Sequence, residues 1–261
     1  MPTFKFVVEY DGTRYRGWQE QKNAKTVAGE LRAVVESISD QTVDLGGSGR
    51  TDAGVHALAQ VAHVRLRRSP GRLADWAWRI NEALPPDIHV RRVEAADERF
   101  HARHHAVSRS YLYQVSTRRT AFAKRFVWWV RDELNTAAMV DASRRLVGRH
   151  DFAAFCEKPD AQTSTTVVVD DVRIVQAGAL LLVRVEASHF LWKMVRRLVG
   201  ALVEVGRGSI GELEIERLLL GEGSRFEPAR ATAPPSGLFL EAVRYPGDAP
   251  LAAPTPAVTV A

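Results

Sequence analysis

The chain has 261 residues, 46% of them hydrophobic and 26% charged, which is enough for one large domain or two medium ones with cores of their own. No apolar run is long enough to cross a bilayer, and the charged, strand-like start TFKFVVEY does not resemble a signal peptide, so we expect a cytoplasmic protein. The single cysteine, Cys156, excludes an internal disulfide and a cysteine-rich zinc site.

The first half of the chain alternates between strand and helix patterns. Apolar and polar residues alternate over 4–10, which predicts a strand, and a turn follows at Asp11-Gly12. Thr26 can cap a helix whose apolar residues, from Val27 to Ile38, recur on one side at 3.6 residues per turn. The remaining expected elements are a glycine-rich loop, a strand over 56–66, a helix over 73–84 and a strand over 88–96.

The second half repeats this alternation. A strand is expected over 108–116, and a helix carrying Met139, Leu146 and Val147 follows it. The later expected elements are two strands within 165–187, a helix over 190–206, a shorter helix near 213–220 and a last strand over 236–245.

This order of elements predicts an α+β fold made of two similar halves, whose antiparallel or mixed sheets are covered by helices. We place the N-terminal half, which carries the glycine-rich loop, at residues 1–105 and the C-terminal half at 106–245. The Ala- and Pro-rich tail, 246–261, is expected to be disordered.

The charge pattern indicates a polyanionic partner. The net charge is +5, and arginines crowd the stretch from Arg65 to Arg119, where acidic residues are fewer. The planar fork of arginine suits phosphate, so the distribution favours a nucleic acid over the alternative that the charge only keeps the chain soluble.

The loop GGSGRTDAGVHA, residues 46–57, concentrates glycines around one carboxylate, Asp52, with Arg50 two residues before it. It lacks the Lys-Ser/Thr ending of a P-loop, and no clustered carboxylates accompany it as in a metal nuclease. Asp52 is either an ordinary turn aspartate or a catalytic group, with glycines that let a ligand come close to the backbone. His56 is expected to stabilise the loop.

Two further segments could contact RNA. Arg109, Tyr111 and Tyr113 share one face of a strand; an arginine beside a tyrosine can sandwich a base, although Tyr113 is better explained as a core residue. Lys193 and Arg196 belong to a cationic stripe that is either solvated or delivers Arg196 to a carboxylate. The histidines of FHARHH, residues 100–105, lack the pattern of a zinc site.

Seven motifs in order resemble the tRNA pseudouridine synthases of the TruA type, over nearly the whole chain up to about Tyr245. The motifs are YDGTRYRGWQEQ, GSGRTDAGVHALAQVAH, LPPDIHVRRV, FHARHHAVSRSYLY, GRHDFAAF, FLWKMVRRLVGALVEVGRG and APPSGLFLEAVRYP. The resemblance implies the pseudouridine synthase fold, in which the two halves join into one large sheet flanked by helices.

The resemblance also implies an isomerase that converts uridine to pseudouridine in the anticodon arm of tRNA, at nucleotide positions 38, 39 and 40. It implies a homodimer that needs neither a metal nor an organic cofactor. Asp52 matches the catalytic aspartate of the family. Tyr111 matches its conserved tyrosine, Arg196 the arginine of its MVR motif and Leu238 the leucine of its GL motif.

The residues suggest roles for such a reaction without fixing its steps. Arg50 would hold displaced backbone or the gap that a flipped base leaves. Asp52 would attack C1′ of the ribose or remove a proton from the sugar, and the sequence does not choose between the two. Arg196 would keep Asp52 charged, Tyr111 would stack on the base and Leu238 would line the pocket. An RNA-binding protein without chemistry, or an enzyme for another uridine, are the competing interpretations.

Overall fold

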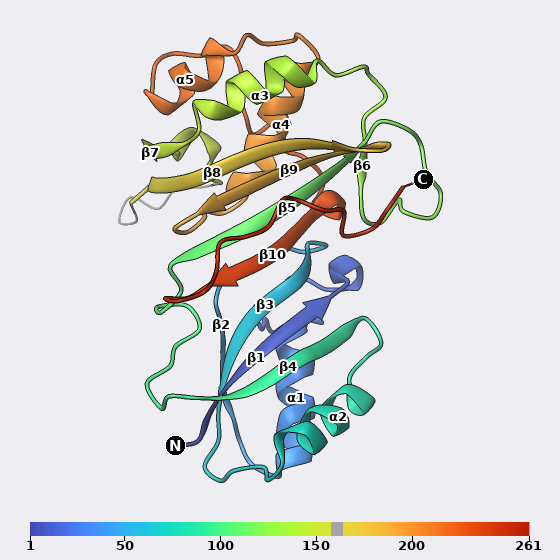
Figure 1. The fold of residues 1–261 in the computed structure, drawn as a ribbon, viewed down its shortest axis with the longest axis vertical. Coiled ribbons are helices and arrows are strands. Elements are labelled where there is room, and N and C mark those ends of the chain that lie inside the picture. Colours follow the sequence, from blue (N-terminus) through green and yellow to red (C-terminus); the bar gives the residue numbers. More distant parts are fainter. Residues whose placement is uncertain (158–163, 261) are drawn as a thin grey trace. The chain divides into compact units, whose positions relative to one another are not determined.

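The computed structural model describes residues 1–157 and 164–260, which divide into two compact units. Unit 1 comprises Met1–Val107 and Leu240–Asp248, and unit 2 comprises Ser108–Phe239 and Ala249–Ala261. The strands and helices expected from the sequence occur in that order, and the structure adds the short strands β2, β6 and β7 (Figure 1). Among the described residues, no helix has the length and apolar character needed to span a membrane.

In unit 1 the strands lie in the order β4-β1-β3-β10, and β2 pairs with β3. The pairings of β1 with β3, of β1 with β4 and of β2 with β3 are antiparallel. The strand bounds are β1 Thr3–Tyr10, β2 Asp44–Gly47, β3 His56–Arg65, β4 Ile88–Ala96 and β10 Leu238–Arg244, whose first two residues belong to unit 2. The helices are η1 Gly12–Arg14, α1 Val27–Ser39 and α2 Leu73–Ala83.

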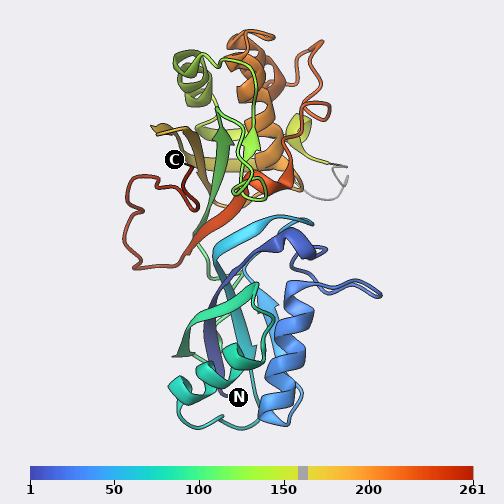
Figure 2. The ribbon, with the colours of Figure 1, turned by 90° about the vertical axis from the view of Figure 1, so that its right-hand side faces the viewer.

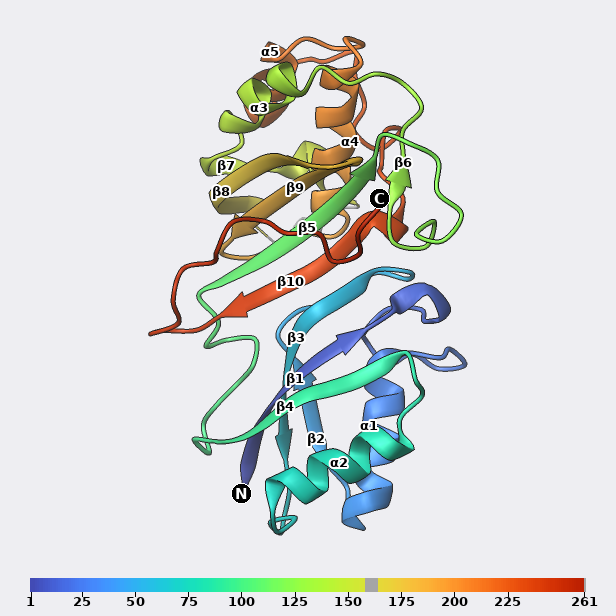
Figure 3. The ribbon, with the colours of Figure 1, turned by 45° about the vertical axis from the view of Figure 1, so that its right-hand side comes forward.

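The helices of unit 1 begin and pack as their sequences predict (Figure 3). Thr26 caps α1, because its hydroxyl accepts a hydrogen bond from the Gly29 amide at 3.3 Å. Trp76 of α2 packs edge-on against Phe4 and Phe6 of β1, with ring centroids 5.2 and 5.3 Å away, and all three rings are buried. This aromatic cluster fixes α2 on one face of the sheet.

In unit 2 the strands lie in the order β5-β9-β8-β7, and β6 adds to β5 as a parallel strand. The strand bounds are β5 Ser108–Ser116, β6 Trp128–Trp129, β7 Gly148–Asp151, β8 Thr166–Ala177 and β9 Leu180–Ala187. The helices are α3 Thr136–Arg144, η2 Ala153–Phe155, α4 Met194–Gly206, α5 Leu213–Leu219 and η3 Pro235–Gly237 (Figure 2).

Helix α4 begins four residues later than the apolar pattern predicts, so the expected helix over 190–206 is wrong at its start. Lys193 has a φ of 61°, in the left-handed region, and the Met194 amide donates to the Leu191 carbonyl in a tight turn. Residues 190–193 are therefore available for contacts outside the helix: the Glu157 amide donates to the Trp192 carbonyl, and Phe190 contacts Tyr111.

The C-terminal stretch returns to unit 2. The side-chain oxygen of Gln114 accepts a hydrogen bond from the Ala257 amide at 2.7 Å, and Arg184 donates to the carbonyl of Ala252. The strands pair in both antiparallel and parallel directions, and helices flank them. This confirms the predicted α+β class.

Candidate active site

The loop that carries Asp52, residues 48–55, is fastened to β3 at its start. The Ser48 amide donates to the Val61 carbonyl at 2.8 Å, and the Ser48 hydroxyl donates to the side-chain oxygen of Gln60 at 2.8 Å. The amide of the same Gln60 side chain donates to the Gly49 carbonyl at 3.1 Å. Ser48 and Gln60 are buried, so these bonds are protected from water and fix where the loop leaves the strand.

The middle of the loop is held at the residue next to Asp52. The Thr51 carbonyl accepts from the Trp18 amide at 3.1 Å, and the buried Thr51 and Tyr10 hydroxyls are hydrogen-bonded at 2.7 Å. On the other side the Asp52 carbonyl accepts from the Val55 amide at 3.1 Å. The backbone around Asp52 is thus fixed, while the Asp52 residue itself stays half-buried.

The end of the loop is held by the YDG turn, residues 10–12. The Gly12 amide donates to Nδ1 of His56 at 3.0 Å, and a carboxylate oxygen of Asp11 lies 3.2 Å from the same nitrogen. Burial raises the pKa of Asp11, but the neighbouring His56 ring and the hydrogen bonds from Thr13 outweigh it and hold that pKa below its ordinary value. His56 is buried and stabilises the loop, as the sequence predicts.

The glycines of this region are required for different reasons. The expectation that all of them let a ligand approach the backbone is therefore only partly correct. A Cβ on Gly46 would lie 2.5 Å from the His63 ring, and one on Gly47 would lie 2.4 Å from the Trp18 indole nitrogen. Gly54 is needed for its φ of 78°. Of Gly46, Gly47 and Gly49, only Gly49 has a Cβ position with nothing within 4 Å. Among these three, Gly49, next to the exposed Arg50, therefore leaves the most room for a ligand at the backbone.

In unit 2, Tyr111 lies in the middle of β5. Its ring meets Phe190 edge-on, with centroids 5.0 Å apart, and 8% of the residue is exposed. Tyr113, on the same face of the strand, is fully buried; its hydroxyl donates to the Pro234 carbonyl at 2.8 Å. Burial raises the pKa of the Tyr113 hydroxyl well above its ordinary value, against a smaller opposing effect of Arg196. Tyr113 is thus the core residue that the sequence indicates.

Arg196 and Leu238 are joined through the segment 231–238. The Arg196 side chain donates through Nε to the Ala233 carbonyl at 2.7 Å, and the Ala233 amide donates to the Arg196 carbonyl at 3.0 Å. Leu238 is buried at the start of β10, directly after η3. A Cβ on Gly237 would lie 2.6 Å from the Tyr113 ring, so this segment packs closely on β5.

Arg109 does not present the flat face that a base sandwich with Tyr111 requires. It is 9% exposed, and its Nη1 donates to the Ser188 carbonyl at 2.9 Å. Arg109 and Tyr111 do share one face of β5, as expected. The Arg109 guanidinium, however, is hydrogen-bonded to the backbone at the end of β9.

Sequence analysis did not identify Arg197 and Glu157. Arg197 is buried at 6% exposure; it donates to the Cys156 carbonyl at 2.5 Å and forms an ion pair with Glu157. Lys193 also lies 3.4 Å from the Glu157 carboxylate. The one signal in the sequence was a second arginine directly after Arg196, on the side of α4 whose other residues are apolar.

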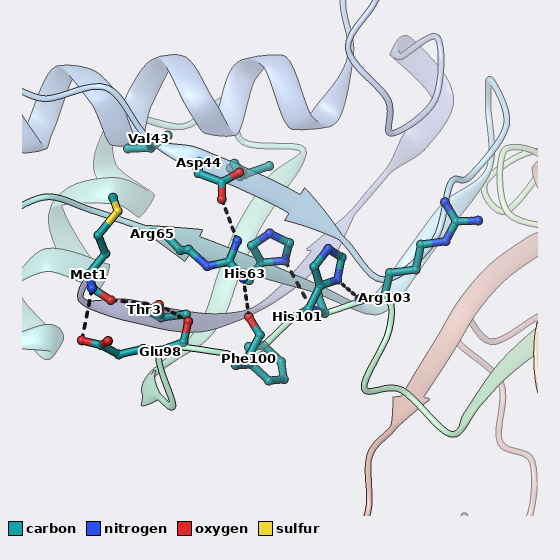
Figure 4. A network of polar contacts seen from close by, with 12 residues as sticks. Met1, Thr3, Val43, Asp44, His63, Arg65, Glu98, Phe100, His101 and Arg103 are labelled. Carbon is teal, nitrogen blue, oxygen red and sulfur yellow. Dashed lines mark hydrogen bonds and ion pairs between the residues drawn. The ribbon is translucent and has the colours of Figure 1, made fainter.

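Of the histidines in residues 100–105, His101 lies against His63 of β3 (Figure 4). His63 accepts from the Ala102 amide through Nδ1 at 3.2 Å, and its ring centroid is 4.5 Å from that of His101. In the described part of the chain, no three His, Cys, Asp or Glu side chains are grouped so that they could hold a metal ion.

The family model described as tRNA pseudouridine synthase matches residues 6–105 and 142–246, which include all five predicted site residues except Tyr111. The chain belongs to the tRNA pseudouridine synthase family. The tRNA pseudouridine synthase A of Geobacter sulfurreducens is 40% identical over 247 residues, which are 94% of this chain and 100% of the relative. The protein of that name from Rhodopseudomonas palustris is 39% identical over 250 residues, with the same coverage.

Membership of the tRNA pseudouridine synthase family confirms the resemblance and the isomerase class inferred from the sequence. The structure places Arg50 and Asp52 in unit 1 and Tyr111, Arg196 and Leu238 in unit 2. Within unit 2 the structure joins Arg196 to the segment that leads into Leu238. The pairing of Arg196 with Asp52 stays a prediction.

Proposed function

We propose that this protein isomerises uridine to pseudouridine in tRNA and that Asp52 is its catalytic residue. Family membership supports the reaction and the substrate. The observation that carries the choice of Asp52 is the construction of its loop, in which Thr51 and the Asp52 backbone are fixed while the carboxylate-bearing residue stays partly exposed. A catalytic group needs this combination of fixed position and access to substrate.

We place the target in the anticodon arm, at tRNA positions 38, 39 and 40, and propose that the enzyme works as a homodimer in the cytoplasm. These details rest on the motif resemblance. The basic charge of the chain, +5, supports a polyanionic substrate.

The reaction breaks the bond between C1′ and N1, turns the uracil and joins C1′ to C5; the proton of C5 is lost and N1 gains one. Atoms and electrons balance within the nucleotide, so one carboxylate suffices. Asp52 either attacks C1′ to give a covalent sugar intermediate or takes a proton from the sugar to give an unsaturated one. In both routes the uridine first leaves the stack, which costs a few kcal/mol.

The other site residues serve this chemistry. Arg50, exposed beside the open Gly49, contacts the RNA backbone or fills the place of the flipped base. Tyr111 stacks on the uracil and assists removal of the C5 proton, and Leu238 excludes water from the pocket. The motif resemblance assigns Arg196 to the site, and the tether of its Nε to Ala233 supplies a fixed orientation.

The test is a pseudouridine map of tRNA treated with wild-type protein and with Asp52→Asn. Chemical labelling of pseudouridine detects the product, since the isomerisation leaves the mass unchanged. We expect wild type to modify the anticodon arm and Asp52→Asn to give no detectable product, with tRNA affinity unchanged within about threefold. Normal turnover by Asp52→Asn would refute the catalytic assignment. Binding without product by the wild type would favour an RNA-binding protein.

A further inference from the structure

A basic loop that follows β5 and runs into β6, residues 117–129, stands outside the site described above. It carries four cations and no acidic residue: Arg118, Arg119, Lys124 and Arg125. Phe122 at its tip is 98% exposed and Trp129 at its end is 41% exposed. Neither the family motifs nor the proposed chemistry uses this loop.

The loop borders an open depression of about 600 Å³, lined by Arg119, Thr120, Ala121, Lys124, Val127 and Trp129. The Arg119 guanidinium lies over the Trp129 ring, 5.8 Å from its centroid. The depression thus offers one aromatic face and two cations, the combination that binds a nucleotide by its base and its phosphate.

The depression is held in shape by bonds to the backbone of its loop. The Phe126 amide donates to the Ala123 carbonyl at 2.8 Å, and the Gln114 side chain donates to the Phe126 carbonyl at 2.9 Å. The Ser236 hydroxyl donates to the Val127 carbonyl at 3.2 Å, which ties this wall to the segment that leads into Leu238. The depression and Leu238 therefore lie near each other within the same unit.

We propose that the Arg119–Trp129 depression binds a second nucleotide of the RNA substrate, with its base on Trp129 and its phosphate between Arg119 and Lys124. This proposal rests on the proposed function for its ligand. A second copy of this chain is the other conceivable occupant. The like charge of the loop and of the whole chain, +5, opposes it.

The experiment measures binding of full-length tRNA to the Asp52→Asn protein, at several salt concentrations, with added substitutions in the depression. Trp129→Leu removes the stacking face and should weaken binding about 5- to 100-fold, whereas Trp129→Phe should restore most of it. Arg119→Gln/Lys124→Gln removes both cations from this one phosphate. It should lower the slope of log affinity against log salt by roughly 0.7 to 0.9.

The matched control is Trp78→Leu on α2, which removes an exposed tryptophan from unit 1. We expect it to leave affinity within about twofold. Equal weakening by control and test variants, or no weakening by Trp129→Leu, overturns the proposal. So does a change of oligomeric state in the sedimentation of Trp129→Leu with unchanged RNA affinity. Failure of the proposed function would appear separately, as wild-type protein that makes no pseudouridine.

Discussion

The segments that carry Asp52 and Arg196 are built in different ways. Asp52 lies in a loop that groups outside it fix, among them the Gln60 side chain, the Trp18 amide and the Tyr10 hydroxyl. Arg196 lies in the first turn of α4, whose backbone is fixed by the helix itself. A loop that presents a catalytic group must therefore be held by its surroundings. The substitutions that displace Asp52 most should be at residues that do not touch the substrate.

The largest expected effect on stability lies on the α4 side. Arg197→Met leaves the Cys156 carbonyl without its donor and Glu157 without its buried partner, at a cost of about 3 kcal/mol in the free energy of unfolding. Urea unfolding measures this cost. The neighbouring Arg196→Met removes one bond to Ala233 and should cost about 1 kcal/mol, yet abolish most turnover. If Arg197→Met is as stable as wild type, the assignment of a structural role to Arg197 and a functional role to Arg196 is wrong.

On the loop side, Gly12→Ala is the next largest change. Its Cβ would lie 1.9 Å from the Val55 carbonyl oxygen, so the loop or the turn must shift, at about 2–3 kcal/mol. Gly49→Ala is the matched control, since its Cβ position is open, and it should unfold within about 0.5 kcal/mol of wild type. If Gly49 faces the RNA, its variant raises KM for tRNA while Gly12→Ala lowers kcat. Equal melting temperatures of the two variants would contradict this account.

Acid should destabilise the start of the glycine-rich loop, residues 46–57, through His63 (Figure 4). The His63 ring packs against Gly46, on which a Cβ would lie 2.5 Å from the ring. Burial, then the charge of Arg65 and the neighbouring His101 and His104, lower the pKa of His63 from 6.5 to about 4, and Asp44 opposes them weakly. The unfolded chain then binds more protons than the folded one between these values. The contribution of His63 to the free energy of unfolding is therefore fully present above about pH 6.5. Toward pH 4 the free energy of unfolding falls by up to about 1.4 kcal/mol per pH unit.

Urea midpoints at pH 7.5, 6 and 5 measure this loss. His63→Asn keeps an acceptor for the Ala102 amide and removes the titrating ring, so its stability should change less over the same range. The exposed His89→Gln is the control and should follow wild type. A wild-type midpoint that is constant from pH 7.5 to 5 would contradict the role of His63.

The sequence predicted the elements and the candidate residues more fully than their surroundings. Alternation and capping placed α1 correctly, because Thr26 and the apolar face of that helix act locally. The start of α4 was misplaced because the left-handed Lys193 carries no local signal in an otherwise apolar run. The contacts that fix the backbone around Asp52 were not predictable. Tyr10 and Thr51 are 41 residues apart in the sequence, and the pairing of β1 with β3 brings them together. Arg109 illustrates the same limit, since its face was predicted but its carbonyl partner was not.

The smallest change tests most directly whether the hydrogen bond between Tyr10 and Thr51 positions Asp52. Thr51→Val removes the hydroxyl that Tyr10 contacts at 2.7 Å and should cost only about 1 kcal/mol of stability. Because Thr51 adjoins Asp52, a small displacement of the carboxylate should still lower kcat about tenfold with KM for tRNA nearly unchanged. Tyr10→Phe removes the same bond from the other side, so the double variant Tyr10→Phe/Thr51→Val should lose little more than either single one. Fully additive losses in kcat would mean that the two hydroxyls act separately and that the bond between them does not position Asp52.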